Sequence, residues 1–280
     1  MKITKIDAEP FHVLPYLRVK KGGKGVELVD LPFYKICVDR LSSALSALLI
    51  TSDLQGVECK GHTKGKAKAG SRLLGHVVTD QAPGILREQG IEASRTGVLL
   101  AGDMHSDVSL ERRGGFGDVR EVWRAFRDTF KWVAGVAGNH DYCGEPEDIA
   151  AFRNEKGVHL LVSDVVTLDG VRLGGVSGVI GRSAKPWRNS EAAHGSMIQR
   201  VVKQSPALLL LHEGPSINER GLEGSDVIRR QLESCRPCTV ICGHKHWPGN
   251  VAHPLSNGMQ VLNSEGKVLV LVKEGHHACV

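Results

Sequence analysis

Two tetrapeptides concentrate side chains that bind metal ions or transfer protons: Gly138-Asn139-His140-Asp141 and Gly243-His244-Lys245-His246. Each follows a short apolar run and begins with glycine. A turn with a purely structural role does not require these residue types, whereas imidazole, carboxylate and amide oxygen are the groups with which proteins hold divalent cations. The two motifs therefore predict a metal cluster at the ends of β-strands, and with it hydrolytic chemistry.

Three more polar residues follow apolar runs: Asp53, Asp103 and His212. The runs that precede them have the length and composition of buried strands. Ligands of α/β sheets gather at the carboxyl ends of the strands. Together with Asn139 and His244, five strand ends that carry Asp, Asn or His predict one convergent site.

The elements that must position these residues alternate between apolar runs and segments of helical periodicity, which predicts an α/β fold. The predicted helices are 71–89, 118–130, 147–155, 190–203 and 225–234. The predicted strands are 46–51, 97–101, 131–137, 207–211 and 239–242, three short strands within 158–181, and a hairpin of 260–263 with 267–272.

Local residue types refine these elements. Pro83-Gly84 predicts an interruption of the first helix, because proline removes a helical hydrogen bond. Asp118 and Ser190 precede helices as N-caps. Asp169-Gly170 is typical of a two-residue hairpin turn. Residues 1–45 are expected to form a strand or hairpin that leads into the core.

The chain has 280 residues, of which 41% are hydrophobic and 24% charged, and its formal net charge is +5. No linker divides it, so we expect a single domain over residues 1–280, with a basic flexible loop near residues 57–72. No secretory signal precedes residue 13, and no run approaches the ~20 apolar residues that a bilayer requires. We therefore expect a cytoplasmic protein without a membrane partner. The mild charge does not by itself indicate nucleic-acid binding.

In their order along the chain, the five strand ends and the two tetrapeptides resemble the calcineurin-like metallophosphoesterases. The resemblance spans residues 46–246. It implies a two-sheet β-sandwich flanked by helices, a four-layer α/β/β/α arrangement, and two bound divalent metal ions. Manganese is the favoured metal, while iron, zinc, magnesium and nickel remain open.

The resemblance also implies a role for each site residue. The metal ligands would be Asp53, Gln55, Asp103, Asn139, His212, His244 and His246. Asp103 would bridge the two ions, with Asp53 and His246 on the first ion. His140 would act on the scissile phosphate or its leaving group, and Asp141 would orient His140. A metal-bridging hydroxide would attack the phosphorus of a phosphate mono- or diester.

One position departs from the family. The first motif is usually Asp-x-His, but here Gln55 follows Asp53-Leu54. An amide oxygen is a hard neutral ligand, which favours manganese or magnesium over zinc. Whether Gln55 binds an ion stays open, and His105 is an alternative that would compensate for it.

The function implied by the resemblance is a metal-dependent phosphoesterase, with a small phosphorylated molecule as the favoured substrate. Gln55 keeps open a metal-depleted, non-catalytic scaffold of the same fold. The basic loop keeps open a nuclease, although nucleic acid is not the favoured partner. Trp247 is expected either to line the mouth of the site or to pack in the core.

Overall fold

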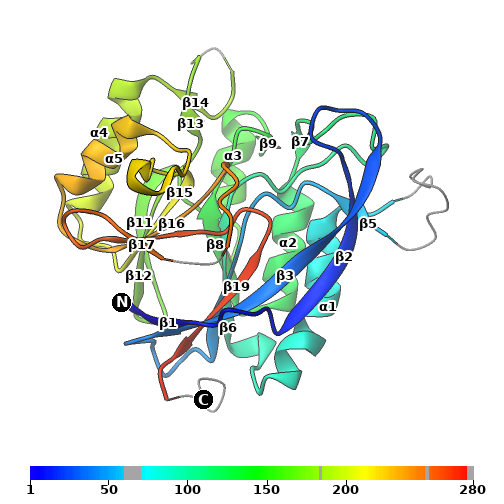
Figure 1. Ribbon diagram of the computed structural model, residues 1–280, viewed down its shortest axis with the longest axis horizontal. Coiled ribbons are helices and arrows are strands. Elements are labelled where there is room, and N and C mark those ends of the chain that lie inside the picture. Colours follow the sequence, from blue (N-terminus) through cyan, green and yellow to red (C-terminus); the bar gives the residue numbers. More distant parts are fainter. Residues whose placement is uncertain (60–70, 183–184, 250–251, 276–280) are drawn as a thin grey trace.

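The computed structural model describes residues 1–59, 71–182, 185–249 and 252–275. Two β-sheets lie face to face, and helices cover their outer faces (Figure 1). This is the four-layer sandwich that the sequence predicts. None of the helices in the described ranges is long and apolar enough to cross a membrane.

The larger sheet has the strand order β10-β8-β6-β4-β19-β3-β2-β5, with β1 paired to β3. Its strands are β1 (Ile3–Ile6), β2 (His12–Val19), β3 (Val26–Val38), β4 (Ala47–Thr51), β5 (Val57–Glu58), β6 (Thr96–Ala101), β8 (Trp132–Val136), β10 (Val158–Leu160) and β19 (Val268–Lys273). Strands β4, β6, β8 and β10 run parallel. Their carboxyl ends therefore lie at one edge of the sandwich. Strand β19 lies between β4 and β3 and pairs with both.

The smaller sheet has the order β11-β12-β15-β16-β18-β17. Its strands are β11 (Ser163–Leu168), β12 (Val171–Val176), β15 (Leu208–Glu213), β16 (Thr239–Gly243), β17 (His253–Pro254) and β18 (Gln260–Asn263). Strands β12, β15, β16 and β18 run parallel. Two short ribbons, β7 (Gly117–Asp118) with β9 (Asp141–Tyr142) and β13 (Val179–Ile180) with β14 (Arg188–Asn189), lie outside the sheets.

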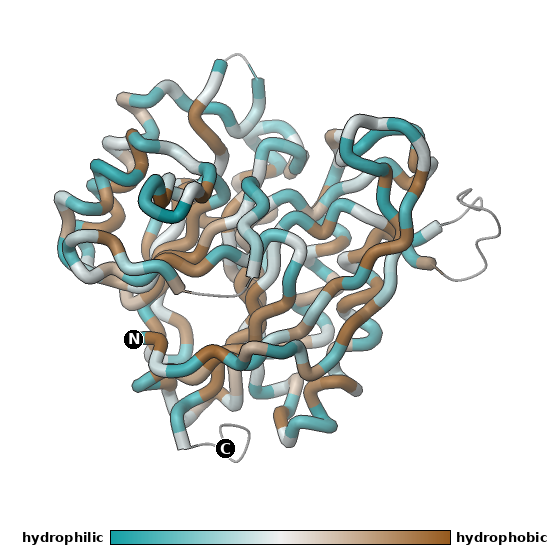
Figure 2. Tube along the Cα trace, in the orientation of Figure 1, coloured by the Kyte–Doolittle hydropathy of each residue, from teal (hydrophilic) through white to brown (hydrophobic). Residues whose placement is uncertain are grey.

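Helices α1 (Leu74–Glu88), α2 (Arg120–Thr129) and α3 (Pro146–Arg153) pack on the larger sheet. Helices α4 (Glu191–Val202) and α5 (Asp226–Glu233) pack on the smaller one. A third apolar cluster fills the space between the sheets with side chains from both, among them Leu48, Leu99 and Leu210. The central strands are accordingly the most hydrophobic part of the chain (Figure 2). The buried apolar faces hold both sheets at a fixed spacing, which positions the strand ends described below.

Several local predictions are confirmed. Ser190 caps α4 by accepting a backbone hydrogen bond from Ala193. Asp169 and Gly170, both with positive φ, form the two-residue turn between β11 and β12. Helix α2 begins later than expected, with Val119 rather than Asp118 as its N-cap residue. The carboxylate of Asp118 still accepts a hydrogen bond from the Arg120 backbone N–H.

Two local predictions are wrong. Helix α1 continues through Pro83, because its neighbours Ala82, Ile85 and Leu86 are buried in the core and their packing outweighs one lost hydrogen bond. Residues 260–263 and 267–272 do not form a hairpin, since β18 and β19 belong to different sheets.

The chain crosses between the sheets just after β18. The Ser264 N–H donates to Cys242 in the smaller sheet, and the Gly266 N–H donates to Ser52 beside the larger one.

Of the predicted basic loop, Val57–Glu58 forms strand β5, while residues 60–70 lie outside the described residues. A single domain over residues 1–280 stays a prediction.

Candidate metal centre

The predicted ligands lie where strands of both sheets end. Asp53, Asp103 and Asn139 follow β4, β6 and β8 of the larger sheet. His212 lies near the end of β15, and His244 directly follows β16 of the smaller sheet. The parallel strands thus bring together residues that are far apart in the sequence. The His244 N–H, for example, donates a hydrogen bond to the Asp53 carboxylate, 191 positions away.

Three of these residues have a left-handed backbone. Asp53, Asp103 and His244 have φ values of 54°, 58° and 68°. Residues other than glycine rarely adopt such backbone angles, and those that do are concentrated at functional sites. At each of these positions the left-handed backbone ends the extended strand, and the side chain lies in the space between the strand ends of the two sheets.

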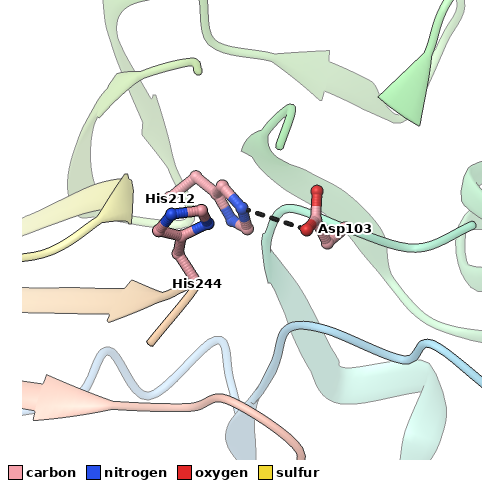
Figure 3. A group of neighbouring side chains, drawn as sticks. All are labelled: Asp103, His212 and His244. Carbon is pink, nitrogen blue, oxygen red and sulfur yellow. Dashed lines mark ion pairs between the residues drawn. The ribbon is translucent and has the colours of Figure 1, made fainter. Parts of the chain in front are cut away.

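Asp103, His212 and His244 form a potential metal-binding group. Their ligand atoms all lie within 4.8 Å of one another. Asp103 comes from the larger sheet, and the two histidines come from the smaller one and face it (Figure 3). The imidazole rings of His212 and His244 are 5.1 Å apart between centroids. One carboxylate and two imidazoles are a donor set suited to a divalent transition metal.

Two buried atoms at this site have no hydrogen-bond partner among the described residues: Asn139 Oδ1 and His212 Nε2. The other ring nitrogen of His212 donates to the Ala101 carbonyl oxygen at 2.8 Å. That bond fixes the tautomer of neutral His212 and leaves the Nε2 lone pair free. Nε2 lies 3.3 Å from Asp103 Oδ2. Two electron-rich atoms in buried contact require a cation, so these residues fit a metal ion.

The pKa shifts of the buried groups at the site also favour a cation there. Burial raises the pKa of Asp53, which the carboxylate of Asp103 raises further. Burial alone would lower the pKa of His212, but Asp103 raises it well above its ordinary value. The buried carboxylates therefore favour a positive charge beside them, which a bound dication would supply.

Asp141 supports the backbone of the site. Its carboxylate accepts hydrogen bonds from the N–H groups of Asp103, Met104 and Gly138 at 2.8–2.9 Å. These bonds tie the turn after β6 to the turn after β8. A Cβ at position 138 would collide with the Asp103 carboxylate, so the close approach requires glycine. The prediction that Asp141 orients the His140 ring is wrong, because its oxygens serve these three amides.

His140 is held by a different partner. Its Nδ1–H donates to the Gly115 carbonyl oxygen, and its backbone N–H donates to Asp103 Oδ1 at 2.9 Å. Nε2 lies 4.0 Å from Asp103 Oδ2. The imidazole therefore stands beside the metal-binding group with Nε2 directed toward it. Gly115 was not found from the sequence, because a backbone carbonyl leaves no residue-type pattern.

Gln55 reaches the site but uses its amide nitrogen there. Nε2 donates to Asp103 Oδ2 at 3.0 Å. An amide in this orientation stabilises the negative charge of Asp103 by donating a hydrogen bond to it. His105 does not take its place: its ring lies against Gly115 and Gly117, and it is not part of the group formed by Asp103, His212 and His244.

His246 lies apart from that group, and its side chain is 73% exposed. Nδ1–H donates to Glu265 Oε2 at 2.7 Å. Glu265 follows β18 and bridges to Ser52, the neighbour of Asp53. The sequence did not identify Glu265, because no motif surrounds it and its position depends on the crossing between the sheets.

Trp247 is buried in the core, and its indole N–H donates to the Glu223 carbonyl oxygen. It therefore packs in the core rather than lining the mouth of the site.

Comparisons with known proteins bear on the family and the fold of the chain. The family model of the calcineurin-like phosphoesterases matches residues 48–248. The solved structure of TT1561 from Thermus thermophilus is similar with a TM-score of 0.54 and 13% identity, over 78% of this chain and 88% of that chain. At this identity, the likeness shows the fold alone.

Two further structures match with lower TM-scores. One is described as a novel archaeal phosphodiesterase (TM-score 0.34, 16% identity, 78% of this chain and 82% of that chain). The other is AQ665 from Aquifex aeolicus, a protein of unknown function (TM-score 0.33, 12% identity, 80% and 95%). No curated protein matches the chain.

Proposed function

Because the chain belongs to the calcineurin-like phosphoesterase family, we propose that it is a metal-dependent hydrolase of phosphate mono- or diesters. The observation that carries this proposal is the convergence of Asp103, His212 and His244 within 4.8 Å. The unpartnered atoms of Asn139 and His212 support it, since both offer a lone pair where a cation is needed.

Members of the family usually bind two divalent metal ions. In our proposal, Asp103, Asn139, His212 and His244 hold one ion, and Asp53, Asp103 and His246 hold the other. When bound, the ions supply Lewis acidity, which lowers the pKa of water and offsets the charge of phosphoryl oxygens. Manganese as the native metal and a cytoplasmic location remain predictions.

The remaining residues act on the substrate and on the ligands. His140, fixed by the Gly115 carbonyl, directs Nε2 to the place of the substrate phosphate. There it donates a hydrogen bond to a phosphoryl oxygen or a proton to the leaving oxygen. Asp141 keeps Asp103 and Gly138 at a fixed separation through its amide contacts. Preorganised ligands lose no free energy to rearrangement during the reaction.

A direct assay tests the proposal. Protein loaded with Mn²⁺ is expected to hydrolyse p-nitrophenyl phosphate or its bis ester, and to lose that activity with a chelator. His140→Ala is expected to lower kcat by about 10²–10⁴-fold while metal content, measured by elemental analysis, is unchanged. His76→Ala on α1 is the matched control and should retain the wild-type rate. Failure of the wild type to hydrolyse either ester with any divalent metal would contradict the proposal.

One observation favours a second candidate, the metal-depleted scaffold. Gln55 donates to Asp103 instead of presenting its amide oxygen to an ion. A scaffold would purify with little bound metal, whereas the enzyme would carry one to two ions per chain. Substitution Gln55→His separates the two further, because it should raise the metal content of an enzyme whose first ion is held weakly.

A further inference from the structure

The segment Arg112–Phe116 borders the place where the substrate phosphate would lie. A Cβ at Gly114 would stand 3.2 Å from His140 Cε1 and 3.4 Å from Gln55 Nε2. The next carbonyl, that of Gly115, holds the His140 ring. The backbone of this segment therefore passes directly against His140 and Gln55.

Phe116 presents an aromatic ring at this point. The residue is 50% exposed. Its ring centroid lies 5.8 Å from that of Tyr142, at an interplanar angle of 59°. Tyr142 is in β9, two residues after His140, and β7 and β9 lie side by side at the upper rim of the molecule in Figure 1. Single exposed apolar residues are common on protein surfaces, but this residue lies between Gly115 and Gly117, whose backbone groups both hydrogen-bond to His140.

Arg112 and Arg113 add positive charge to the same segment. Both are exposed. Among the residues that the structure describes, no carboxylate forms an ion pair with either guanidinium, although several other arginines of the chain are paired. A guanidinium binds phosphate oxygens through two parallel hydrogen bonds. The segment thus combines an aromatic face with groups that bind phosphate.

We propose that Arg112–Phe116 recognises a nucleoside phosphate, with the nucleobase stacked on Phe116 and a phosphate oxygen bound by Arg112 or Arg113. This inference rests on the proposed function and names the substrate class of the same site. A sugar phosphate would need several polar partners for its hydroxyl groups, whereas an aromatic ring offers a stacking surface for any base.

The test compares two ligands that differ only in the base. Adenosine 5′-monophosphate and ribose 5-phosphate are used as competitors of p-nitrophenyl ester hydrolysis by the Mn²⁺-loaded protein, and Ki is measured for each. Stacking of one base on an aromatic side chain contributes about 1–3 kcal/mol, so the nucleotide should bind at least about fivefold more tightly.

Three variants test which residues cause the difference in Ki between the two ligands. Phe116→Ala is expected to raise Ki for the nucleotide to that for ribose 5-phosphate, and Phe116→Trp to preserve the difference. Arg113→Ala should weaken both ligands by the same factor, since both carry the phosphate. Val108→Ala, which alters another exposed apolar residue (46% exposed) preceding this segment, is the matched control and should change neither Ki.

Equal Ki values in the wild type, or an equal loss for both ligands in Phe116→Ala, would overturn the inference. If the wild type hydrolyses neither ester, the proposed function fails by itself. The same affinity ratio is then measured by calorimetry, and a base preference that depends on Phe116 would still uphold the recognition site, whereas its absence would refute it.

Discussion

At the scale of single residues, Glu265 would prepare His246 for the ligand role of the proposed function before an ion binds. By accepting the Nδ1–H of His246, it leaves Nε2 as the nitrogen available to a metal. A carboxylate in this position also makes the imidazole a more basic ligand. Because Gln55 stands where an imidazole is expected, the first ion of the proposed function would depend more strongly on His246 and thus on Glu265.

We expect Glu265→Gln to weaken the binding of one Mn²⁺ by about 10–100-fold, the usual effect of removing such a partner. Calorimetric titration of the metal-free protein measures this affinity. The double variant Glu265→Gln with His246→Ala should bind no more weakly than His246→Ala alone. Glu223→Gln, which removes an exposed carboxylate near Lys245, is the control. Two unchanged Mn²⁺ affinities in Glu265→Gln would exclude this role.

At the scale of elements, helix α4 carries a buried histidine outside the site. His194 is fully buried, and burial lowers its pKa to about 4. At neutral pH the ring is uncharged in both the folded and the unfolded state. Below its ordinary pKa of about 6.5 the unfolded chain gains a proton that the folded chain does not accept until about pH 4. The folded state consequently loses stability as the pH falls through this range.

Between pH 7 and pH 4, His194 is expected to remove up to about 3 kcal/mol from the free energy of unfolding. His194→Gln, which does not titrate, should be less sensitive to acid by that amount. Urea denaturation of both proteins at several pH values gives the comparison. If the free energies of unfolding of the two proteins change in parallel from pH 7 to pH 4, His194 is not the source of the acid sensitivity.

The elements also show what the sequence alone could predict. Strands that end in Asp, Asn or His are recognisable because apolar runs and polar ends are local patterns, and so is the serine cap of α4. The separation of β18 from β19 was not predictable in this way, because a short connection is equally compatible with a hairpin. Glu265 depends on that crossing, and Gly115 acts through its backbone, so neither leaves a local pattern.

For the whole molecule, the important feature is that the site joins the two sheets. Asp53, Asp103 and Asn139 belong to one sheet's strand ends, and His212 and His244 to the other's. Ions bound by both sets would connect the halves of the sandwich at one edge, while the shared apolar cluster connects them through its interior. Metal binding and folding stability should therefore be linked.

We expect saturating Mn²⁺ to raise the melting temperature by several degrees. A ligand at 100 times its Kd stabilises the folded state by about 2.7 kcal/mol. Differential scanning calorimetry with Mn²⁺ and with a chelator measures the shift. His212→Ala, which removes a ligand of only one of the two proposed ions, should show a smaller shift than the wild type. An equal melting temperature of the wild-type protein with and without Mn²⁺ would show that the sheets are not linked through the ions.

The position of β19 has a consequence for biosynthesis. In the larger sheet, β4 and β3 are joined only through this strand, which is the last one in the described sequence. While a ribosome is still translating the preceding residues, the hydrogen bonds on both sides of that central gap cannot form. The nascent chain must keep two partial sheets apart until Val268–Lys273 leaves the exit tunnel, so chaperone contacts during synthesis should be concentrated on the exposed edges of β3 and β4.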